Sequence, residues 1–497
     1  MRTAIERRTF LQAFAAYMGD APAIRAQRSH QPNVLFVLAD EWRAQSIGYN
    51  GDQNVHTPAL DRFAAESVNF QTAVSGCPIC CPYRASLLTG QYPLTNGVFI
   101  NDVELKPKGL TLGEAFKRAG YRTGFIGKWH VYGSPDGKYG RRLAYIPPEK
   151  RFGFDYWKVC ECTHEYNHSL YYEDDDTKPK YWTGYDAIAQ TADACEFIEG
   201  RSKARDPFFL TLSLGPPHFP YATAPESYQQ LYRNREIRLR PNVPDDKREE
   251  AVRNLRGYYA HMAALDDCMA RLLGTLERTG ISEDTIVVFT SDHGDMMLSQ
   301  GLTTKLHPWD ESIRVPFLIR YPRNLSTKGR RIRTLINSPD IMPTLLGMCG
   351  IPRPESVEGN DYSGLLAGGP PPHGSVAALL SLPVPTTEAR RYGFAEYRGL
   401  RTEQHTYIRS IHGPWLLYDN ERDPYQMHNL CGRGEHKQLQ AQLDHALDAR
   451  LRELKDDFLP AAEYVRRANL GHYREISVAI GYHRSPWGDW ESTLTKQ

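Results

Sequence analysis

The strongest constraint on the fold is a set of strand-like segments that end abruptly at charged or imidazole-bearing residues. The first, residues 33–39, is a continuous apolar run without alternation of apolar and polar positions. This pattern is typical of a strand buried on both faces, as in a sheet covered by helices. Three further segments end in the same way: residues 121–126, 208–214 and 285–290.

Helical patterns separate these segments. Between residues 258 and 276, for example, apolar residues recur at spacings of three and four. The alternation of strands and helices predicts an α/β domain, in which ligands bind beyond the carboxyl ends of the strands. The four segments place reactive side chains at those ends: Asp40 and Glu41, Lys128 and His130, His218, and Asp292 and His293. A catalytic site is therefore expected at this edge of the sheet.

The chain of 497 residues exceeds the size at which one hydrophobic core stops growing, so we expect two domains. A linker-like Gly/Pro stretch at 368–372 precedes three short strand-like pieces at 391–398, 405–411 and 415–418. An amphipathic helix follows, with Leu439, Leu443, Leu447, Leu451 and Leu454 on one face. We expect a catalytic domain over residues 31–370 and a smaller α+β domain with an aromatic-rich tail over residues 371–497.

Residues 1–30 form a candidate leader. Arg7 and Arg8, followed by Thr9-Phe10-Leu11, resemble a twin-arginine export signal and indicate a periplasmic or secreted protein. A plain basic N-terminus, which would leave the protein in the cytoplasm, is the alternative. The net charge of +1 gives no global basic field for nucleic acid, and no apolar run approaches the roughly 20 residues of a membrane span.

Three of the nine cysteines lie close together in the stretch GCPICCPYRASLLTG, residues 76–90. An odd and sparse set does not indicate a disulfide scaffold. Cys77 and Cys80 have the spacing of one half of a zinc site, but the other candidate pair, Cys160 and Cys162, has the wrong spacing. The zinc interpretation is therefore disfavoured, and inert buried thiols are expected at Cys195, Cys268 and Cys349.

The segment from Cys80 to Gly90 fits the signature C-x-P-x-R-x-x-x-L-T-G. It resembles that of the type I sulfatases, in the alkaline-phosphatase-like superfamily. The resemblance runs in matching order from about residue 32 to residue 430. It implies a large, mostly parallel mixed sheet flanked by helices, and sulfate ester hydrolysis. It also implies that a maturation enzyme oxidises Cys80 to formylglycine, because Cys77 lacks the proline and arginine at the required spacing.

A hydrated aldehyde explains why a thiol alone would not serve. One of its two hydroxyls attacks sulfur and becomes sulfated, and deprotonation of the other collapses the adduct and expels sulfate. The local sequence suits this role, since Pro82 favours the first turn of a helix. Cys80 would then lie at a helix N-terminus, where the helix dipole favours anions.

The resemblance also implies a divalent metal held by Asp40, Glu41, Asp292 and His293, with residue 80 facing the ion. Glu41 departs from the family pattern, which has a second aspartate there. Oxygen ligands favour Ca²⁺, the usual ion of the family, while a histidine nitrogen and a glutamate also suit Mn²⁺ or Mg²⁺. The expected role of the ion is to bind a sulfate oxygen and polarise the nucleophilic hydroxyl.

The remaining expected roles follow the same resemblance. Lys128 contacts the sulfate, and His130 takes the proton that triggers aldehyde release. His218 binds sulfate or protonates the leaving oxygen, Lys305 contacts the bridging oxygen, and Arg84 holds the formylglycine and the metal-side carboxylates. The segment at 310–316 also matches the family, and we interpret it as scaffold.

An aromatic and polar insert at 157–182 contains His164, Glu165, Tyr166, Asn167, His168, Tyr171 and Tyr172. Stacking on sugars and ordinary packing are equally compatible with it. We expect a sulfated carbohydrate as substrate, with a small sulfate ester also accepted. The alternatives are a phosphonate monoester or phosphodiester hydrolase of the same superfamily, suggested by Glu41 and His293, and a binding protein in which Cys80 is never oxidised.

Overall fold

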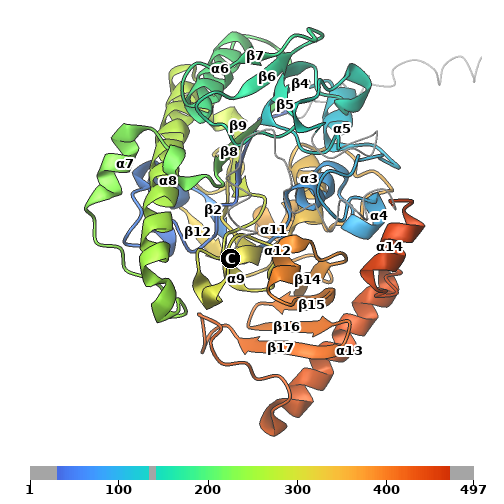
Figure 1. Cartoon of the computed structure of the whole chain (residues 1–497). Coiled ribbons are helices and arrows are strands. Elements are labelled where there is room, and N and C mark those ends of the chain that lie inside the picture. Colours follow the sequence, from blue (N-terminus) through green and yellow to red (C-terminus); the bar gives the residue numbers. More distant parts are fainter. Residues whose placement is uncertain (1–30, 134–140, 471–497) are drawn as a thin grey trace, which may run out of the picture. The chain divides into compact units, whose positions relative to one another are not determined.

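The computed structural model describes residues 31–133 and 141–470, so the expected leader and the aromatic-rich tail lie outside the described residues. Within the described chain the strands form a ten-stranded sheet, a three-stranded sheet and a four-stranded sheet. Figure 1 shows how the helices and strands of these segments are arranged. No helix in these described segments is both long and apolar enough to cross a membrane.

The large sheet contains all four strands expected from the sequence as adjacent members. Its order is β12 (Arg330–Ile332), β2 (Val68–Phe70), β11 (Phe317–Arg320), β9 (Thr285–Ser291), β1 (Asn33–Asp40), β8 (Phe208–Pro217), β4 (Arg122–Lys128), β5 (Tyr156–Cys160), β6 (Leu170–Glu173) and β7 (Lys180–Tyr181). β1 pairs in parallel with β8 and β9, and β4 pairs in parallel with β8 and β5. Antiparallel pairs at β9–β11 and β5–β6 make the sheet mixed, as expected.

β1 shows why the first apolar run lacks alternation. Successive side chains of a strand point to opposite faces, so a strand covered on both sides is apolar throughout. Val34, Phe36 and Leu38 belong to one hydrophobic core, which includes residues of α3 (Cys80–Thr89), α5 (Leu112–Arg118) and α10 (Ile341–Met348). Leu35, Val37 and Ala39 belong to a second core with α6 (Asp186–Arg201) and α8 (Arg248–Arg278).

The expected helix at 258–276 is part of α8, which is longer than the apolar pattern suggested. The other helices of the described chain are α2 (Pro58–Ala65), α4 (Pro93–Asn96), α7 (Glu226–Arg233), α9 (Asp310–Ile313), α11 (Ser363–Leu366), α12 (Thr387–Arg391), α13 (Lys437–Glu453) and α14 (Ala461–Arg467). The three-stranded sheet consists of β10 (Arg314–Val315), β3 (Ala73–Val74) and β13 (Ile336–Asn337).

The C-terminal part carries an antiparallel sheet of β14 (Ala377–Leu382), β15 (Tyr397–Thr402), β16 (His405–Ser410) and β17 (Gly413–Asp419). In α13, Leu443, Leu447 and Leu451 pack in the core of this region, as the leucine pattern predicted. The expected strand at 391–398 was placed too early. Gly393 adopts a left-handed φ of 74° just after α12, and extended structure begins only at β15.

Candidate active site

Cys80 is the first residue of α3, a helix whose ten residues are all buried. The three neighbouring cysteines are not equivalent. Burial raises the pKa of the Cys77 thiol to about 12 and that of Cys81 to about 11. Burial and the Asp40 carboxylate also oppose ionisation of Cys80, but the nearby cations outweigh them, so its pKa lies well below the usual value. These cations are Lys128, Lys305 and His293.

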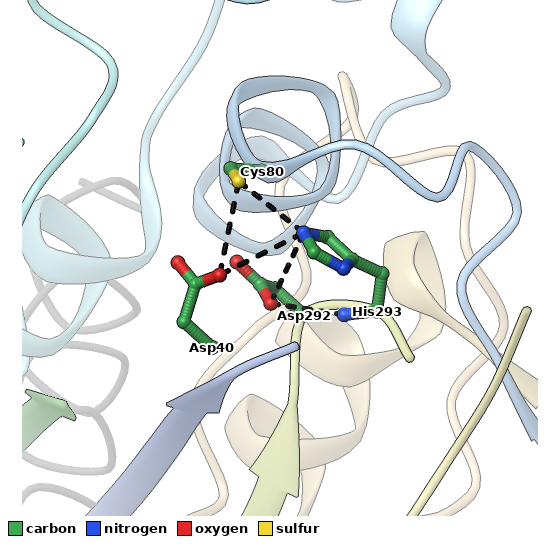
Figure 2. A group of neighbouring side chains, drawn as sticks. All are labelled: Asp40, Cys80, Asp292 and His293. Carbon is green, nitrogen blue, oxygen red and sulfur yellow. Dashed lines mark hydrogen bonds and ion pairs between the residues drawn. The ribbon is translucent and has the colours of Figure 1, made fainter. Parts of the chain in front are cut away.

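Four side chains converge at the start of α3 (Figure 2). One ligand atom from each of Asp40, Cys80, Asp292 and His293 lies within 4.8 Å of those of the others. The Cys80 sulfur is 3.2 Å from His293 Nε2 and 3.8 Å from Asp40 Oδ1. Two carboxylates and an imidazole that meet at one point fit a divalent cation, since these are the donors such ions take in proteins.

Arg84, one turn into α3, fixes the orientation of the two carboxylates. Its Nη2 lies 3.0 Å from Oδ2 of both Asp40 and Asp292, and its Nη1 donates to the Lys128 carbonyl and the Ser213 hydroxyl. Because the Oδ2 atoms are engaged by the guanidinium, the Oδ1 atoms remain on the side of Cys80 and His293. Although burial opposes it, the positive charge of Lys128, aided by Arg84, holds the pKa of Asp40 well below its usual value.

Glu41 lies on a different side of Cys80 from the one expected. Its carboxylate Oε2 is 3.1 Å from His218 Nε2 and 3.7 Å from Lys305 Nζ. Burial raises its pKa well above the ordinary glutamate value. The structure therefore does not bring Glu41 into the four-residue group, and it forms a second possible ligand group with Asp40 and His218.

Two lysines flank the sulfur of Cys80. Lys128 Nζ lies 3.8 Å from it and 2.6 Å from Asp40 Oδ2, while Lys305 Nζ lies 3.6 Å from it and 2.6 Å from His218 Nε2. Asp40, Lys128, His218 and Lys305 all reach the sulfur of Cys80 or its neighbours because the carboxyl ends of parallel strands and the loops after them meet at one edge of the sheet. The arrangement places two cationic groups where an anion attached to residue 80 would lie.

His130 follows β4 with a left-handed φ of 58°, and Glu41 follows β1 with a φ of 68°. Residues other than glycine rarely adopt this region, and such strain is concentrated at functional sites. His130 Nε2 is 3.4 Å from Asp102 Oδ1, and Arg142 binds the same carboxylate at 3.1 and 2.9 Å. Although burial opposes protonation, the pKa of His130 lies well above the ordinary value because of the negative charge of Cys162 and the hydrogen bond to Asp102.

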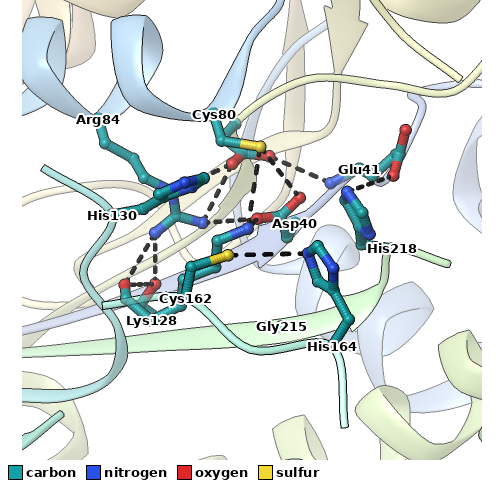
Figure 3. A network of polar contacts seen from close by, with 12 residues as sticks. Asp40, Glu41, Cys80, Arg84, Lys128, His130, Cys162, His164, Gly215 and His218 are labelled. Atoms are coloured by element: carbon teal, nitrogen blue, oxygen red, sulfur yellow. Dashed lines mark hydrogen bonds and ion pairs between the residues drawn. The ribbon is translucent and has the colours of Figure 1, made fainter. Parts of the chain in front are cut away.

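The insert after β5 reaches the site through residues that sequence reasoning did not single out for catalysis (Figure 3). His164 stacks on His218 with ring centroids 4.3 Å apart, and its Nε2 lies 3.8 Å from the sulfur of Cys162. Tyr166 donates a hydrogen bond to the His218 carbonyl. A histidine in an aromatic loop gives no local signal of this role, because the contact depends on how the loop folds back.

The other aromatic residues of the insert divide between the two interpretations. Trp157, Tyr166 and Trp182 are buried in hydrophobic cores, which favours packing. His168 and Tyr181 stack on each other on the surface with ring centroids 4.3 Å apart. Among the described residues, the possible metal-binding groups include neither Cys77 nor Cys160.

The fold and this constellation agree with comparisons to known proteins. The family description "Sulfatase" matches residues 32–351, and "N-sulphoglucosamine sulphohydrolase, C-terminal" matches residues 300–453. The chain belongs to the sulfatase family, in the alkaline-phosphatase-like superfamily, and is a sulfuric ester hydrolase.

Particular relatives cover most of the chain. An ulvan-active sulfatase of Formosa agariphila is 44% identical over 88% of this chain and 84% of that protein. An endo-4-O-sulfatase of Bacteroides thetaiotaomicron is 30% identical over 90% of this chain and 97% of that protein. A solved structure concerning glycosaminoglycan metabolism in the same organism is 29% identical, with a TM-score of 0.77, and covers 90% of this chain and 99% of that one.

Proposed function

We propose that this sulfatase removes sulfate from a sulfated glycan, with residue 80 as formylglycine and with Ca²⁺ in the four-residue group. The relatives at 44% and 30% identity, which are named for ulvan and for endo-4-O-sulfatase activity, support a carbohydrate substrate. The observation that carries the catalytic proposal is the position of the Cys80 sulfur, between the metal-type ligands and two lysines.

Asp40, Asp292 and His293 would hold the ion, and Arg84 keeps the two carboxylates oriented toward it. A divalent cation bound there supplies positive charge for a sulfate oxygen and favours ionisation of the attacking hydroxyl. The carboxylate oxygens favour Ca²⁺, while the single imidazole leaves Mg²⁺ and Mn²⁺ for the metal analysis to distinguish. Glu41 is the member of the expected ligand set that the geometry supports least, since it contacts His218 and Lys305.

Formylglycine at residue 80 would supply a hydrated aldehyde, with one hydroxyl to attack sulfur and another whose deprotonation releases sulfate. Its position at the N-terminus of α3 places the positive end of the helix dipole beside the sulfate. Lys128 and Lys305 bind the anion from either side. Both lysines are buried, so their charges act in a medium of low dielectric and orient the sulfate strongly.

The two histidines divide the proton transfers. His218 donates Nδ1–H to the Phe219 carbonyl when Nε2 receives the Lys305 hydrogen bond, so the Lys305–His218 pair can deliver a proton to the leaving oxygen. His130 would accept the proton from the second hydroxyl of residue 80, and the raised pKa of its imidazole makes it a strong base once it has lost its own proton. Asp102, itself held by Arg142, stabilises the resulting imidazolium.

Peptide mass spectrometry of the fragment containing Cys80, combined with turnover of sulfate esters, tests this proposal. The expected result is a formylglycine mass at residue 80 and release of sulfate from an ulvan or glycosaminoglycan oligosaccharide. An unmodified thiol together with absence of turnover would contradict it. Faster hydrolysis of phosphonate monoesters or phosphodiesters would support the alternative reaction. The solved structure of a phosphonate monoester hydrolase is 24% identical and supports only the shared fold.

Export through residues 1–30 belongs to the same proposal, because a glycan polymer is an extracellular substrate. Cell fractionation with N-terminal sequencing of the mature protein tests it. Recovery of the intact chain from the cytoplasm would contradict export without affecting the catalytic proposal.

A further inference from the structure

A basic cleft of about 470 Å³ lies outside the catalytic residues described above. Its walls come from the loop after β1, the segment before α8, β10 and β12, and the loop after β17. Among the described residues of its lining, Asp52 is the one acidic residue. Five arginines line the cleft: Arg43, Arg238, Arg240, Arg314 and Arg331. In a chain with a net charge of +1, this is a marked local excess of positive charge.

Three of these arginines have no carboxylate partner among the described residues. Arg43 donates to the Ser46 hydroxyl, Arg238 to the Gln53 side-chain oxygen and Arg331 to the Tyr49 carbonyl. The other two, Arg240 and Arg314, are paired with Glu311 and Asp310. Arg238 and Arg331 are exposed, so the cleft presents guanidinium groups that have no carboxylate partner among the described residues, which is an arrangement that binds anions.

A buried amide adds a second, independent observation. Both side-chain polar atoms of Gln45, which lines the cleft, are shielded from solvent and have no hydrogen-bond partner among the described residues. Buried polar atoms in native proteins are normally satisfied, so an unsatisfied amide at a cavity wall indicates a missing partner. Rotation of the Gln45 side chain toward the cleft would let a hydroxyl or an anionic oxygen of a ligand satisfy it.

The cleft begins where the chain leaves the catalytic residues. Arg43 follows Asp40 by three residues, and Met297, which also lines the cleft, follows His293 by four. Three residues of extended chain span about 10 Å, so the backbone of the cleft wall at Arg43 lies within about that distance of Asp40. Across the cleft, Arg240 stacks on the ring of Tyr425 at 4.8 Å, which adds an aromatic surface to the basic wall.

We propose that this cleft binds sulfate or carboxylate groups of the glycan that are remote from the sulfate being hydrolysed. The inference rests on the proposed function, because it identifies where a further part of the same substrate binds. The size of the cleft supports an oligosaccharide rather than a single ion, since cavities of a few hundred Å³ accommodate drug-sized ligands. The combination of planar cations, an amide and an aromatic ring suits a charged sugar.

The test compares two double variants of the full-length protein. Arg238→Gln with Arg331→Gln removes two exposed cleft charges, and Lys203→Gln with Arg205→Gln removes two exposed charges outside the cleft. Binding of dextran sulfate is measured by calorimetry, with neutral dextran as the uncharged control. Hydrolysis of 4-nitrophenyl sulfate reports the catalytic residues separately.

The expected result is a roughly tenfold weaker dextran sulfate affinity in the cleft variant, little change in the control variant and unchanged kcat/KM for 4-nitrophenyl sulfate in both. Equal weakening in the two variants, or none in the cleft variant, would overturn the proposal. So would equally tight binding of inorganic sulfate or of a single-stranded oligonucleotide at this cleft. If the wild-type protein does not hydrolyse 4-nitrophenyl sulfate, that result would count against the proposed catalytic function. The comparison of dextran sulfate affinities would still test whether the cleft binds anionic groups.

Discussion

Two buried clusters of aspartate and arginine use the same chemistry for different ends. In the catalytic cluster, Arg84 is shared by Asp40 and Asp292 and occupies only their Oδ2 atoms. In the second, at the junction with the C-terminal sheet, Asp310 is shared by Arg401 and Arg314. There Oδ1 receives Arg401 Nε, and Oδ2 receives both Arg401 Nη2 and Arg314 Nη1.

The two clusters differ in which carboxylate oxygens are not contacted by a guanidinium group. Asp310 has guanidinium groups on both oxygens, so the cluster is complete and serves as scaffold, as expected for residues 310–316. Asp40 and Asp292 present their Oδ1 atoms toward Cys80 and His293, where a cation fits. Asp292 Oδ1 also accepts the backbone N–H groups of Glu41 and His293, so what distinguishes the catalytic cluster is that the guanidinium leaves both Oδ1 atoms facing Cys80 and His293.

The largest expected effect distinguishes the clusters by function. Asp292→Asn removes a charged ligand oxygen, so turnover of sulfate esters should fall by a factor on the order of 10⁴, with loss of bound metal. The same change at the other cluster, Asp310→Asn, should retain metal and turnover to within a few-fold. Steady-state kinetics and elemental analysis of the purified proteins check both. Equal metal loss in the two variants would remove the distinction.

A second comparison concerns stability. Arg84→Ala leaves two carboxylates close together and should lower the free energy of unfolding by about 3–5 kcal/mol. Arg401→Ala should cost less, about 2–3 kcal/mol, because Asp310 keeps Arg314. Urea denaturation measures both. Added Ca²⁺ should restore part of the loss in Arg84→Ala alone, since ligand binding stabilises the folded state that contains the site.

The acid dependence of stability sharpens the description of the scaffold cluster. Burial opposes ionisation of Asp310, but Arg401 and Arg314 lower its pKa to about 2. Because the folded pKa lies below the unfolded value, the stabilisation is complete above about pH 4 and is lost as the pH falls toward 2. It amounts to about 2 kcal/mol. Urea denaturation between pH 6 and pH 2.5 should show this loss in the wild type and a smaller one in Arg401→Gln; parallel profiles would contradict the assignment.

The smallest effect is expected at Arg314, which is partly exposed and pairs with Asp310 at 3.1 Å. Since Arg401 still contacts both oxygens, Arg314→Gln should lower the free energy of unfolding by about 0.5–1 kcal/mol. Arg314→Lys serves as the charge-conserving control. A loss as large as that of Arg401→Ala would show that the two arginines contribute equally.

Much of the fold could be predicted because the central strands are buried on both faces. Their composition is then dictated by the sheet itself, and the polar residues that follow mark the functional edge. The segment from Cys80 to Gly90 is local, so its resemblance to the sulfatase signature could be recognised in the sequence and singled out Cys80, while Pro82 indicated the start of the helix. β14 was not predicted, although residues 377–382 are largely apolar, because the linker-like residues before it suggested irregular structure.

The parts that could not be predicted depend on long-range contacts. Arg142 binds Asp102, forty residues earlier in the chain, and His164 of the insert stacks on His218, which follows β8. Neither loop has a periodic pattern that would predict the contact. Glu41 was expected beside the metal because the family resemblance places acidic ligands at the end of the first strand. In the structure its backbone is left-handed and its side chain contacts His218. The arginines of the basic cleft come from separate segments, so their shared location is a property of the tertiary structure.

The strand order of the large sheet has a consequence for biosynthesis. β1 has β8 and β9 as its neighbours, so its pairing partners begin at residues 208 and 285. At about 5–20 residues per second, β9 emerges roughly 10–50 s after β1. Throughout that interval α3 has no completed sheet to pack against. If residue 80 is oxidised as proposed, the central position of β1 leaves at least this long for a modifying enzyme to reach the Cys80 segment before the sheet is complete.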